Sequence, residues 1–152
     1  MLWYIIDGWN LVHKIPSVKR DPFPKEELIF FLKRHNLTGS RNNRVTIVFD
    51  GRIDVNIIRA ESQFEIVFSD KKTADDVIRV KISGCKNKRH VFVVSDDREL
   101  ISSVKQEGAN CLKTGDFLSK IKVKKKKENL KDIDYTLQKS ITDEMRKIWL
   151  NE

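Results

Sequence analysis

The sequence has few cysteines and lacks the long apolar runs of a membrane protein. Its two cysteines, Cys85 and Cys111, form no C-x-x-C motif and are not paired with histidines. Neither zinc binding nor a disulfide framework is therefore expected, and a reducing cytoplasm is favoured. No apolar run approaches the ~18 residues of a membrane span. The apolar N-terminal stretch breaks at Asp7 and has no basic lead-in, so it predicts a first strand and not a signal peptide.

Several enzyme classes have no motif in this chain. Its six glycines form neither a Walker loop nor a dinucleotide fingerprint, which argues against nucleotide hydrolysis and hydride transfer. His13, His35 and His90 share no spacing with another catalytic group, and no nucleophilic triad is indicated. What remains is a chain of one domain and a modest extension, with enough hydrophobic residues (39%) to bury a sizeable core.

Basic residues exceed acidic ones. The formal net charge of +8 at pH 7 predicts a polyanionic partner, and nucleic acid is favoured over an anionic membrane. Much of the excess lies in one short part of the chain, at Lys120, Lys122, Lys124–Lys127 and Lys131.

Strand and helix patterns alternate along the chain. Apolar, β-branched runs predict strands over residues 2–6, 45–49, 64–68, 91–94 and 109–112. Apolar residues at helical spacing predict helices over residues 25–35, 73–84 and 96–108. The segment with Pro16, Pro22 and Pro24 predicts a loop, and residues 53–62 are ambiguous. Alternating strands and helices imply an α/β fold with a mostly parallel sheet and helices on both faces.

Acidic residues follow the predicted strands. Apolar runs end in Asp7, Asp50 and Asp96, and Thr73–Asp76 opens a helix just after the strand at residues 64–68. In an open α/β sheet, ligands bind outside the carboxyl ends of the strands. Carboxylates gathered there repel one another, and oxygen ligands without His or Cys point to Mg²⁺ or Mn²⁺. The sequence therefore predicts metal-dependent phosphodiester chemistry.

Most of these acids also have a purely structural explanation. Asp76 suits the end of a capping box that begins at Thr73, Asp96 suits a helix N-cap, and Asp50 precedes a turn glycine. Asp7 is harder to explain in this way, because a carboxylate at the end of a central strand is costly unless it is paired or metal-bound.

The neighbours of the acids have two explanations as well. Asn10 can hydrogen-bond a metal-bound water or a phosphate, or it can form a turn after Gly8. Trp9 can stack on a base, although packing against a neighbouring helix is favoured. Basic residues beside the acids either hold RNA phosphates or are solvated surface charges: Arg52, Lys71, Lys72 and Arg98.

Four motifs in this order resemble the NYN domains, a branch of the PIN-like nucleases, and most of all their YacP-like group, which includes a ribosome-associated endoribonuclease. The motifs are D-G-W-N at residues 7–10, V-F-D at 48–50, T-A-D-D at 73–76 and V-S-D at 94–96. The resemblance covers Leu2 to Phe117. It implies a PIN-like three-layer α/β/α fold with sheet order 3-2-1-4-5, and RNA cleavage that depends on Mg²⁺ or Mn²⁺.

The same resemblance, carried over by position, implies roles for individual residues. Asp7, Asp75 and Asp96 would be the main catalytic metal ligands. Accessory roles, including the positioning of a water or a second ion, would fall to Asn10, Asp50, Asp76 and Asp97.

The expected function is a metal-dependent endoribonuclease that prefers single-stranded RNA, with ribosome-bound mRNA and the ribosome as further expected partners. The nuclease domain is expected over residues 1–118. Residues 119–152 are expected to form a lysine-rich linker and an amphipathic helix over Leu137–Trp149, with RNA contacts from Lys124, Lys125, Lys126 and Lys127. Two alternatives remain open: a catalytically silent PIN-like module that binds RNA or the ribosome, and a DNA-directed nuclease.

Overall fold

The computed structural model describes residues 1–53 and 63–121. The chain divides into two compact units, Met1–Phe117 and Leu118–Glu152, and the sheet lies in the first. Most of the ambiguous stretch Ile53–Ser62 is outside the described residues. The lysines Lys124–Lys127 and the expected helix Leu137–Trp149 are outside them too, so those predictions stay predictions.

Five parallel strands form the sheet, and their order is β3-β2-β1-β4-β5. The strands are β1 (Trp3–Asp7), β2 (Arg44–Phe49), β3 (Phe64–Phe68), β4 (Val91–Val94) and β5 (Asn110–Leu112). Trp3 at the start of β1 pairs with Arg44 on one side and Val91 on the other. The predicted α/β class and the strand order 3-2-1-4-5 are confirmed.

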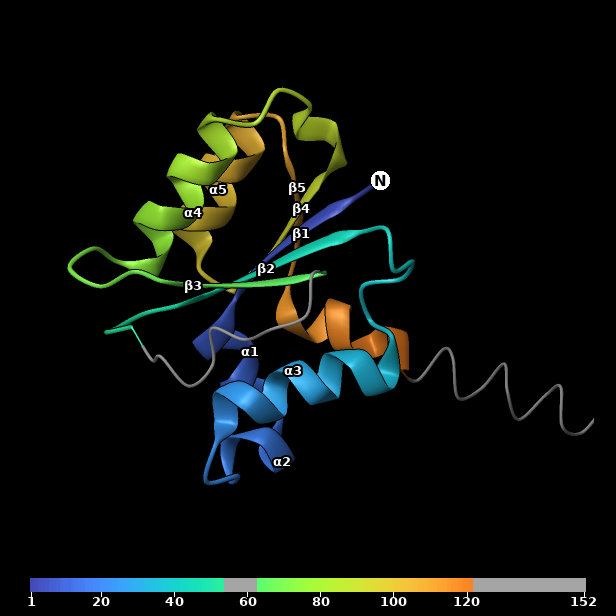
Figure 1. Cartoon of the computed structure of the whole chain (residues 1–152). Coiled ribbons are helices and arrows are strands. Elements are labelled where there is room, and N and C mark those ends of the chain that lie inside the picture. Colours follow the sequence, from blue (N-terminus) through green and yellow to red (C-terminus); the bar gives the residue numbers. More distant parts are fainter. Residues whose placement is uncertain (54–62, 122–152) are drawn as a thin grey trace, which may run out of the picture. The chain divides into compact units, whose positions relative to one another are not determined.

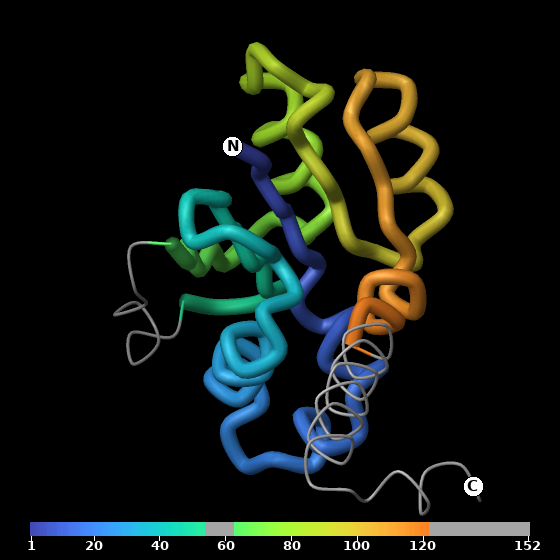
Figure 2. The backbone as a smooth tube through the Cα atoms, turned by 90° about the vertical axis from the view of Figure 1, so that its right-hand side faces the viewer, coloured from blue at the N-terminus to red at the C-terminus, as the bar shows by residue number. Residues whose placement is uncertain are grey.

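Helices cover both faces of this sheet, as Figure 1 and the turned view in Figure 2 show. On one face lie α4 (Ala74–Ser83) and α5 (Arg98–Gln106), and a 3₁₀ turn, η2 (Lys88–His90), joins α4 to β4. On the other face lie α1 (Gly8–Lys14), α2 (Pro16–Lys19) and α3 (Pro24–His35). Helical crossovers of this kind are how parallel strands are connected.

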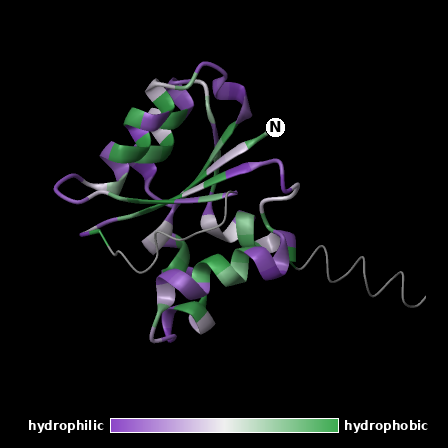
Figure 3. Ribbon diagram, viewed as in Figure 1, coloured by the Kyte–Doolittle hydropathy of each residue, from purple (hydrophilic) through white to green (hydrophobic). Residues whose placement is uncertain are grey.

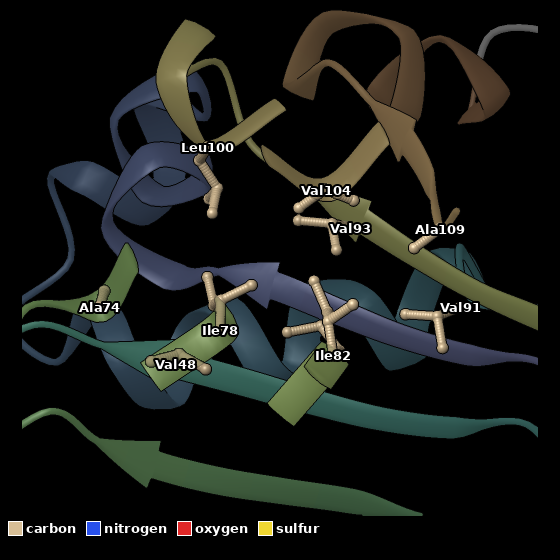
Figure 4. Close-up of a cluster of buried hydrophobic side chains, with 10 residues drawn as sticks. Val48, Ala74, Ile78, Ile82, Val91, Val93, Leu100, Val104 and Ala109 are labelled. Atoms are coloured by element: carbon tan, nitrogen blue, oxygen red, sulfur yellow. The ribbon is translucent and has the colours of Figure 1, made fainter. Parts of the chain in front are cut away.

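The core on the α4–α5 side is aliphatic. Ile5 and Val48 from the sheet pack with Ile78 and Ile82 of α4 and with Leu100 of α5, and Figure 4 shows the helix side chains lying over the strands. The strands are hydrophobic along most of their length, whereas polar residues gather on loops and outer helix faces (Figure 3). Burial on both faces explains why these strands read as continuous apolar runs in the sequence.

The segment predicted as a proline-containing loop is instead mostly helical. Pro16 and Pro24 occupy the first turn of α2 and α3, where proline suits the helix because the missing N–H would have no partner there. Leu11, Ile15 and Val18 are all buried. Their spacing of four and three residues is the helical signal that the prolines obscured.

Two further features bear on the predictions made from composition. No helix in the described part of the chain is long and apolar enough to cross a membrane. Cys85 and Cys111 are free thiols, each partly buried, so these two residues are not joined by a disulfide.

Candidate functional site

Asp7 ends β1 at the carboxyl edge of the sheet, with a relative exposure of 6%. Gly8 follows and begins α1 at once. A Cβ at Gly8 would lie 2.5 Å from the Phe49 ring, so only glycine lets α1 start here against β2. The Oδ2 of Asp7 accepts hydrogen bonds from Asn10 Nδ2 (2.9 Å) and Ser95 Oγ (3.3 Å). Burial raises the pKa of Asp7, and these hydrogen bonds oppose the rise.

Asp75 lies in the first turn of α4. Thr73 is the N-cap of that helix, and its Oγ1 accepts a hydrogen bond from Asp76 N at 3.2 Å. The predicted N-cap is thus confirmed, while the Asp76 side chain is exposed. Burial, together with the neighbouring carboxyls of Asp97 and Asp7, raises the pKa of Asp75 to about 6.

Asp97 is the carboxylate that faces Asp75. Its Oδ1 accepts from Glu99 N at 2.9 Å and from Leu100 N at 3.3 Å, so it is the N-cap of α5. The prediction that Asp96 caps this helix is wrong by one residue. A hydrogen bond with Asp75 lowers the pKa of Asp97, and the backbone N–H of Leu100 lowers it further. The two carboxyls therefore share one proton most readily with Asp75 as the donor.

Asp96 is turned toward a different set of partners. Its Oδ1 accepts from Thr114 N at 2.9 Å, and its Oδ2 accepts from Thr114 Oγ1 at 2.5 Å. Lys14 Nζ lies 3.9 Å from the same Oδ2. The backbone N–H of Asp96 donates to Asn10 Oδ1 at 3.3 Å. Asn10 therefore joins Asp7 to the segment that carries Asp96 and Asp97.

Asp50 stands apart from these four acids within the described part of the chain. Its Oδ1 accepts from Ser69 Oγ at 2.8 Å, and its carbonyl accepts from Trp9 Nε1 at 3.0 Å. Its side chain is exposed. The structure thus brings Asp7, Asp75, Asp96 and Asp97 together and leaves Asp50 in a hydrogen-bonded turn that joins β2 to the end of β3.

Trp9 packs against the core, as favoured from the sequence. Its ring meets the Phe49 ring edge-on, with 5.5 Å between centroids. The ammonium of Lys25 lies 5.6 Å from the centroid of the indole ring. The side chain is partly buried, and its N–H donates to the Asp50 carbonyl. These contacts make Trp9 a support for the turn after β2.

Basic side chains flank the acids. Arg52, Lys71, Lys72 and Arg98 are exposed. Within residues 1–53 and 63–121 none of them forms an ion pair through its side chain. Exposed cations beside a carboxylate cluster are available to hold a polyanion without reading its sequence.

Three residues of this site were missed by sequence reasoning. Ser95 is fully buried and donates to Asp7, Thr114 is fully buried and holds Asp96, and Lys14 is paired with Asp96. Ser95 could have been noticed as the polar residue between β4 and the acids. Thr114 and Lys14 lie far from Asp96 in sequence, and no local pattern marks them.

The donor set consists of carboxylate and amide oxygens, which suits a hard divalent cation. Within the described residues, however, no group of three or more His, Cys, Asp or Glu side chains is arranged to enclose a metal ion. The acids form an open set in which burial and like charge disfavour ionisation of Asp7 and Asp75. A bound cation would relieve that repulsion, so the residues fit such a group in chemistry.

Comparison with known proteins agrees with the fold and with the motifs. The family model described as the YacP-like NYN domain matches residues 4–152. Two crystal structures of Rae1 (YacP) from Bacillus subtilis are similar in fold, each with a TM-score of 0.65. A mutant form is 19% identical, over 95% of this chain and 89% of that one. The other structure is 18% identical, over 98% and 92%. No curated protein matches the chain.

Proposed function

The chain belongs to the YacP-like NYN domain family, a nuclease-like family, and from this premise we propose that it is a divalent-metal-dependent endoribonuclease. The proposed substrate is single-stranded RNA, including mRNA on the ribosome, and the proposed compartment is the cytoplasm. One observation carries the proposal. Asp7, Asp75 and Asp97 come from three separate segments to the carboxyl edge of the sheet, and each interacts electrostatically with another.

The proposed cation is Mg²⁺ or Mn²⁺. Asp7, Asp75 and Asp96 would hold it, with Asp97 beside them, and Asn10, Asp50 and Asp76 would have accessory roles. When bound, such an ion lowers the pKa of a water molecule and stabilises charge on phosphate oxygens. The physical reason for binding is the burial and repulsion that raise the pKa of Asp75 to about 6, because a cation offsets that penalty.

The chain's own residues would orient these acids and the RNA. Asn10 and Ser95 hold the carboxylate of Asp7, and Thr114 holds that of Asp96, so the acids are fixed before a substrate arrives. Phosphates of the RNA would be bound by the exposed cations Arg52, Lys71, Lys72 and Arg98. Attack by water in line with the leaving oxygen would leave a 5′-phosphate on the product.

Asp7→Asn and Asp96→Asn test this function directly. Each change should abolish RNA cleavage while the fold survives, because it removes a charge without altering side-chain shape. Cleavage by the unaltered chain should require Mg²⁺ or Mn²⁺ and stop with EDTA. Mapping 5′ ends on mixed RNA and on translating ribosomes would locate the cuts and identify the 5′-phosphate.

The matched control is Asp70→Asn, which removes the same charge from an exposed turn residue at positive φ, a conformation that asparagine also tolerates. Full activity in EDTA, or in both active-site variants, would refute the metal-nuclease proposal. Metal-independent RNA or ribosome binding without any cleavage would instead support the silent binding module.

A further inference from the structure

Arg79 is a cation on α4 that the function proposed above does not use. The residue is partly buried. Its Nε is fully buried and, among the residues that the structure describes, has no hydrogen-bond partner. Burying a polar group without a partner is unfavourable unless another interaction compensates. The position of Arg79 therefore needs an explanation of its own.

Helix geometry directs Arg79 toward the acidic edge. It lies four residues after Asp75 on α4, and residues four apart lie on the same face of a helix, one turn from each other. The positive charge of Arg79 acts on both Asp75 and Asp97 and lowers the pKa of each. No ion pair within 4.0 Å joins it to either acid in the described part of the chain. Its charge thus acts across a short gap and leaves the carboxylate oxygens open to other ligands.

The charges at this edge can be compared one by one. The acids are Asp7, Asp75, Asp96 and Asp97, and the cations near them are Lys14, 3.9 Å from Asp96 Oδ2, and Arg79. Four negative charges thus face two positive ones, and the excess equals the charge of one divalent ion. Two-metal nuclease sites hold their ions only ~3.5–4 Å apart, which requires more uncompensated carboxylate charge than remains here.

We propose that Arg79 takes the place of a second metal ion, so that the acidic edge binds a single divalent cation. The inference rests on the proposed function, since it concerns the metal site that function requires. Arg79 is a charge-balancing residue in this arrangement. It holds a fixed positive charge beside Asp75 and Asp97, where a second ion would otherwise be stabilised.

Counting bound Mn²⁺ tests this inference without any activity assay. The full chain is titrated with Mn²⁺ alone, and free Mn²⁺ is measured by its electron paramagnetic resonance signal. The expected result is one Mn²⁺ per chain. Arg79→Glu removes the cation and adds a carboxylate, so it should bind two. Arg79→Lys keeps the charge and should bind one.

A second variant keeps the test decisive if Arg79→Glu fails to fold, which thermal melting would reveal. Arg79→Gln should bind its first Mn²⁺ roughly tenfold more tightly, the order expected for one elementary charge acting on a divalent ion about one helical turn away near a protein surface. Lys105→Gln is the matched control. It removes one positive charge from an exposed position on α5 and should leave both the number of ions and their affinity unchanged.

The results separate this inference from the proposed function. Two Mn²⁺ ions on the unaltered chain, or one on a folded Arg79→Glu variant, would overturn the role of Arg79 and leave the metal-dependent nuclease standing. Unchanged Mn²⁺ affinity in Arg79→Gln would overturn it as well. Absence of Mn²⁺ binding to the unaltered chain would overturn both.

Discussion

The aspartates at the carboxyl edge differ in charge state because their surroundings differ. Asp75 is affected by burial and by two neighbouring carboxylates, so its pKa rises to about 6. Asp97 receives hydrogen bonds from Asp75 and from backbone N–H groups, so its pKa falls. A pair of carboxyls whose pKa values are pushed apart is typical of catalytic and metal sites. The residue scale therefore already distinguishes this edge from an ordinary acidic surface.

At this scale, Asp75→Asn is expected to stabilise the metal-free fold at pH 7.5. A carboxyl whose pKa is raised on folding binds its proton more tightly in the native state, so the stability it confers falls as pH rises from about 4 to about 6 and stays low above that. The variant removes this penalty. Its advantage in free energy of unfolding, measured by urea denaturation in EDTA, should be present at pH 7.5 and absent at pH 3.5.

Asp70→Asn serves as the control for that comparison, because it removes an acid at an exposed turn. It should show no such difference between the two pH values. If Asp75→Asn were less stable than the unaltered chain at pH 7.5, the repulsion described for this carboxyl would not exist in solution.

At the scale of single elements, the site depends on how two helices begin. The N-cap Thr73 places Asp75 in the first turn of α4, and Asp97 is itself the N-cap of α5. Each helix thus starts at the carboxyl edge of the sheet and directs its unpaired backbone N–H groups there. The N-terminal ends of two helix dipoles favour negative charge, which partly offsets the crowding of carboxylates.

Thr73→Ala is expected to destabilise the fold by about 0.5–2 kcal/mol, the usual cost of removing an N-cap oxygen. The Thr73 Oγ1 accepts from Asp76 N, and alanine would leave that N–H to water. Thr73→Ser keeps the oxygen and should restore most of the stability. Thermal or urea unfolding of the three proteins makes the comparison, and equal stability of Thr73→Ala and the unaltered chain would show that the cap contributes nothing.

The two acids that follow Thr73 separate capping from chemistry. Asp76→Ala is expected to lower the melting temperature more than Asp75→Ala does, because Asp76 suits the capping box whereas Asp75 is crowded by other carboxylates. Activity should be abolished at Asp75. Thermal melting and RNA cleavage of both variants give the comparison, and an activity defect only at Asp76 would mean that the two aspartates have the opposite roles.

At the scale of the whole molecule, charge is distributed unevenly along the chain. The net charge is +8, yet the candidate site gathers four carboxylates at one edge of the sheet. A polyanionic substrate needs cations to approach such an edge. In the proposed function, Arg52, Lys71, Lys72 and Arg98 supply them close to the acids, and Lys124–Lys127, outside the described residues, supply them from the C-terminal part of the chain.

Replacement of Lys124–Lys127 by Gln is therefore expected to weaken RNA or ribosome binding and to reduce its salt dependence. For single-stranded RNA, the slope of log binding constant against log salt should fall by about 0.7 for each phosphate that the variant no longer neutralises. Cleavage at saturating RNA should persist because the metal ligands are intact. Filter binding or fluorescence anisotropy across a salt series gives the slope.

The control for this prediction removes four exposed basic charges elsewhere, at Lys19, Arg20, Lys86 and Lys105. It matches the change in net charge and should leave the slope closer to that of the unaltered chain. Identical slopes for the lysine-tract variant and the unaltered chain would assign the tract to a passive linker.

Local sequence determined the sheet and the presence of an acidic edge. Buried parallel strands read as apolar runs such as Val45–Phe49, and their order in space follows from the family motifs and from the rules of parallel connections. Acids that directly follow such strands must lie at one edge, whatever the side chains do. The strands, their order and the meeting of Asp7 with the Asp96 segment were therefore predictable.

Only the tertiary structure decided which acid does what. Asp96 and Asp97 are adjacent in sequence, yet one is held by Thr114 and the other faces Asp75, because neighbouring residues at a helix start point in different directions. Prolines and spacing did not identify helix α1, since its formation depends on the burial of Leu11 in the folded chain. Arg79 likewise gains its role from the burial of its Nε and from acids on other segments. Contacts between distant segments set these features, and no local pattern encodes them.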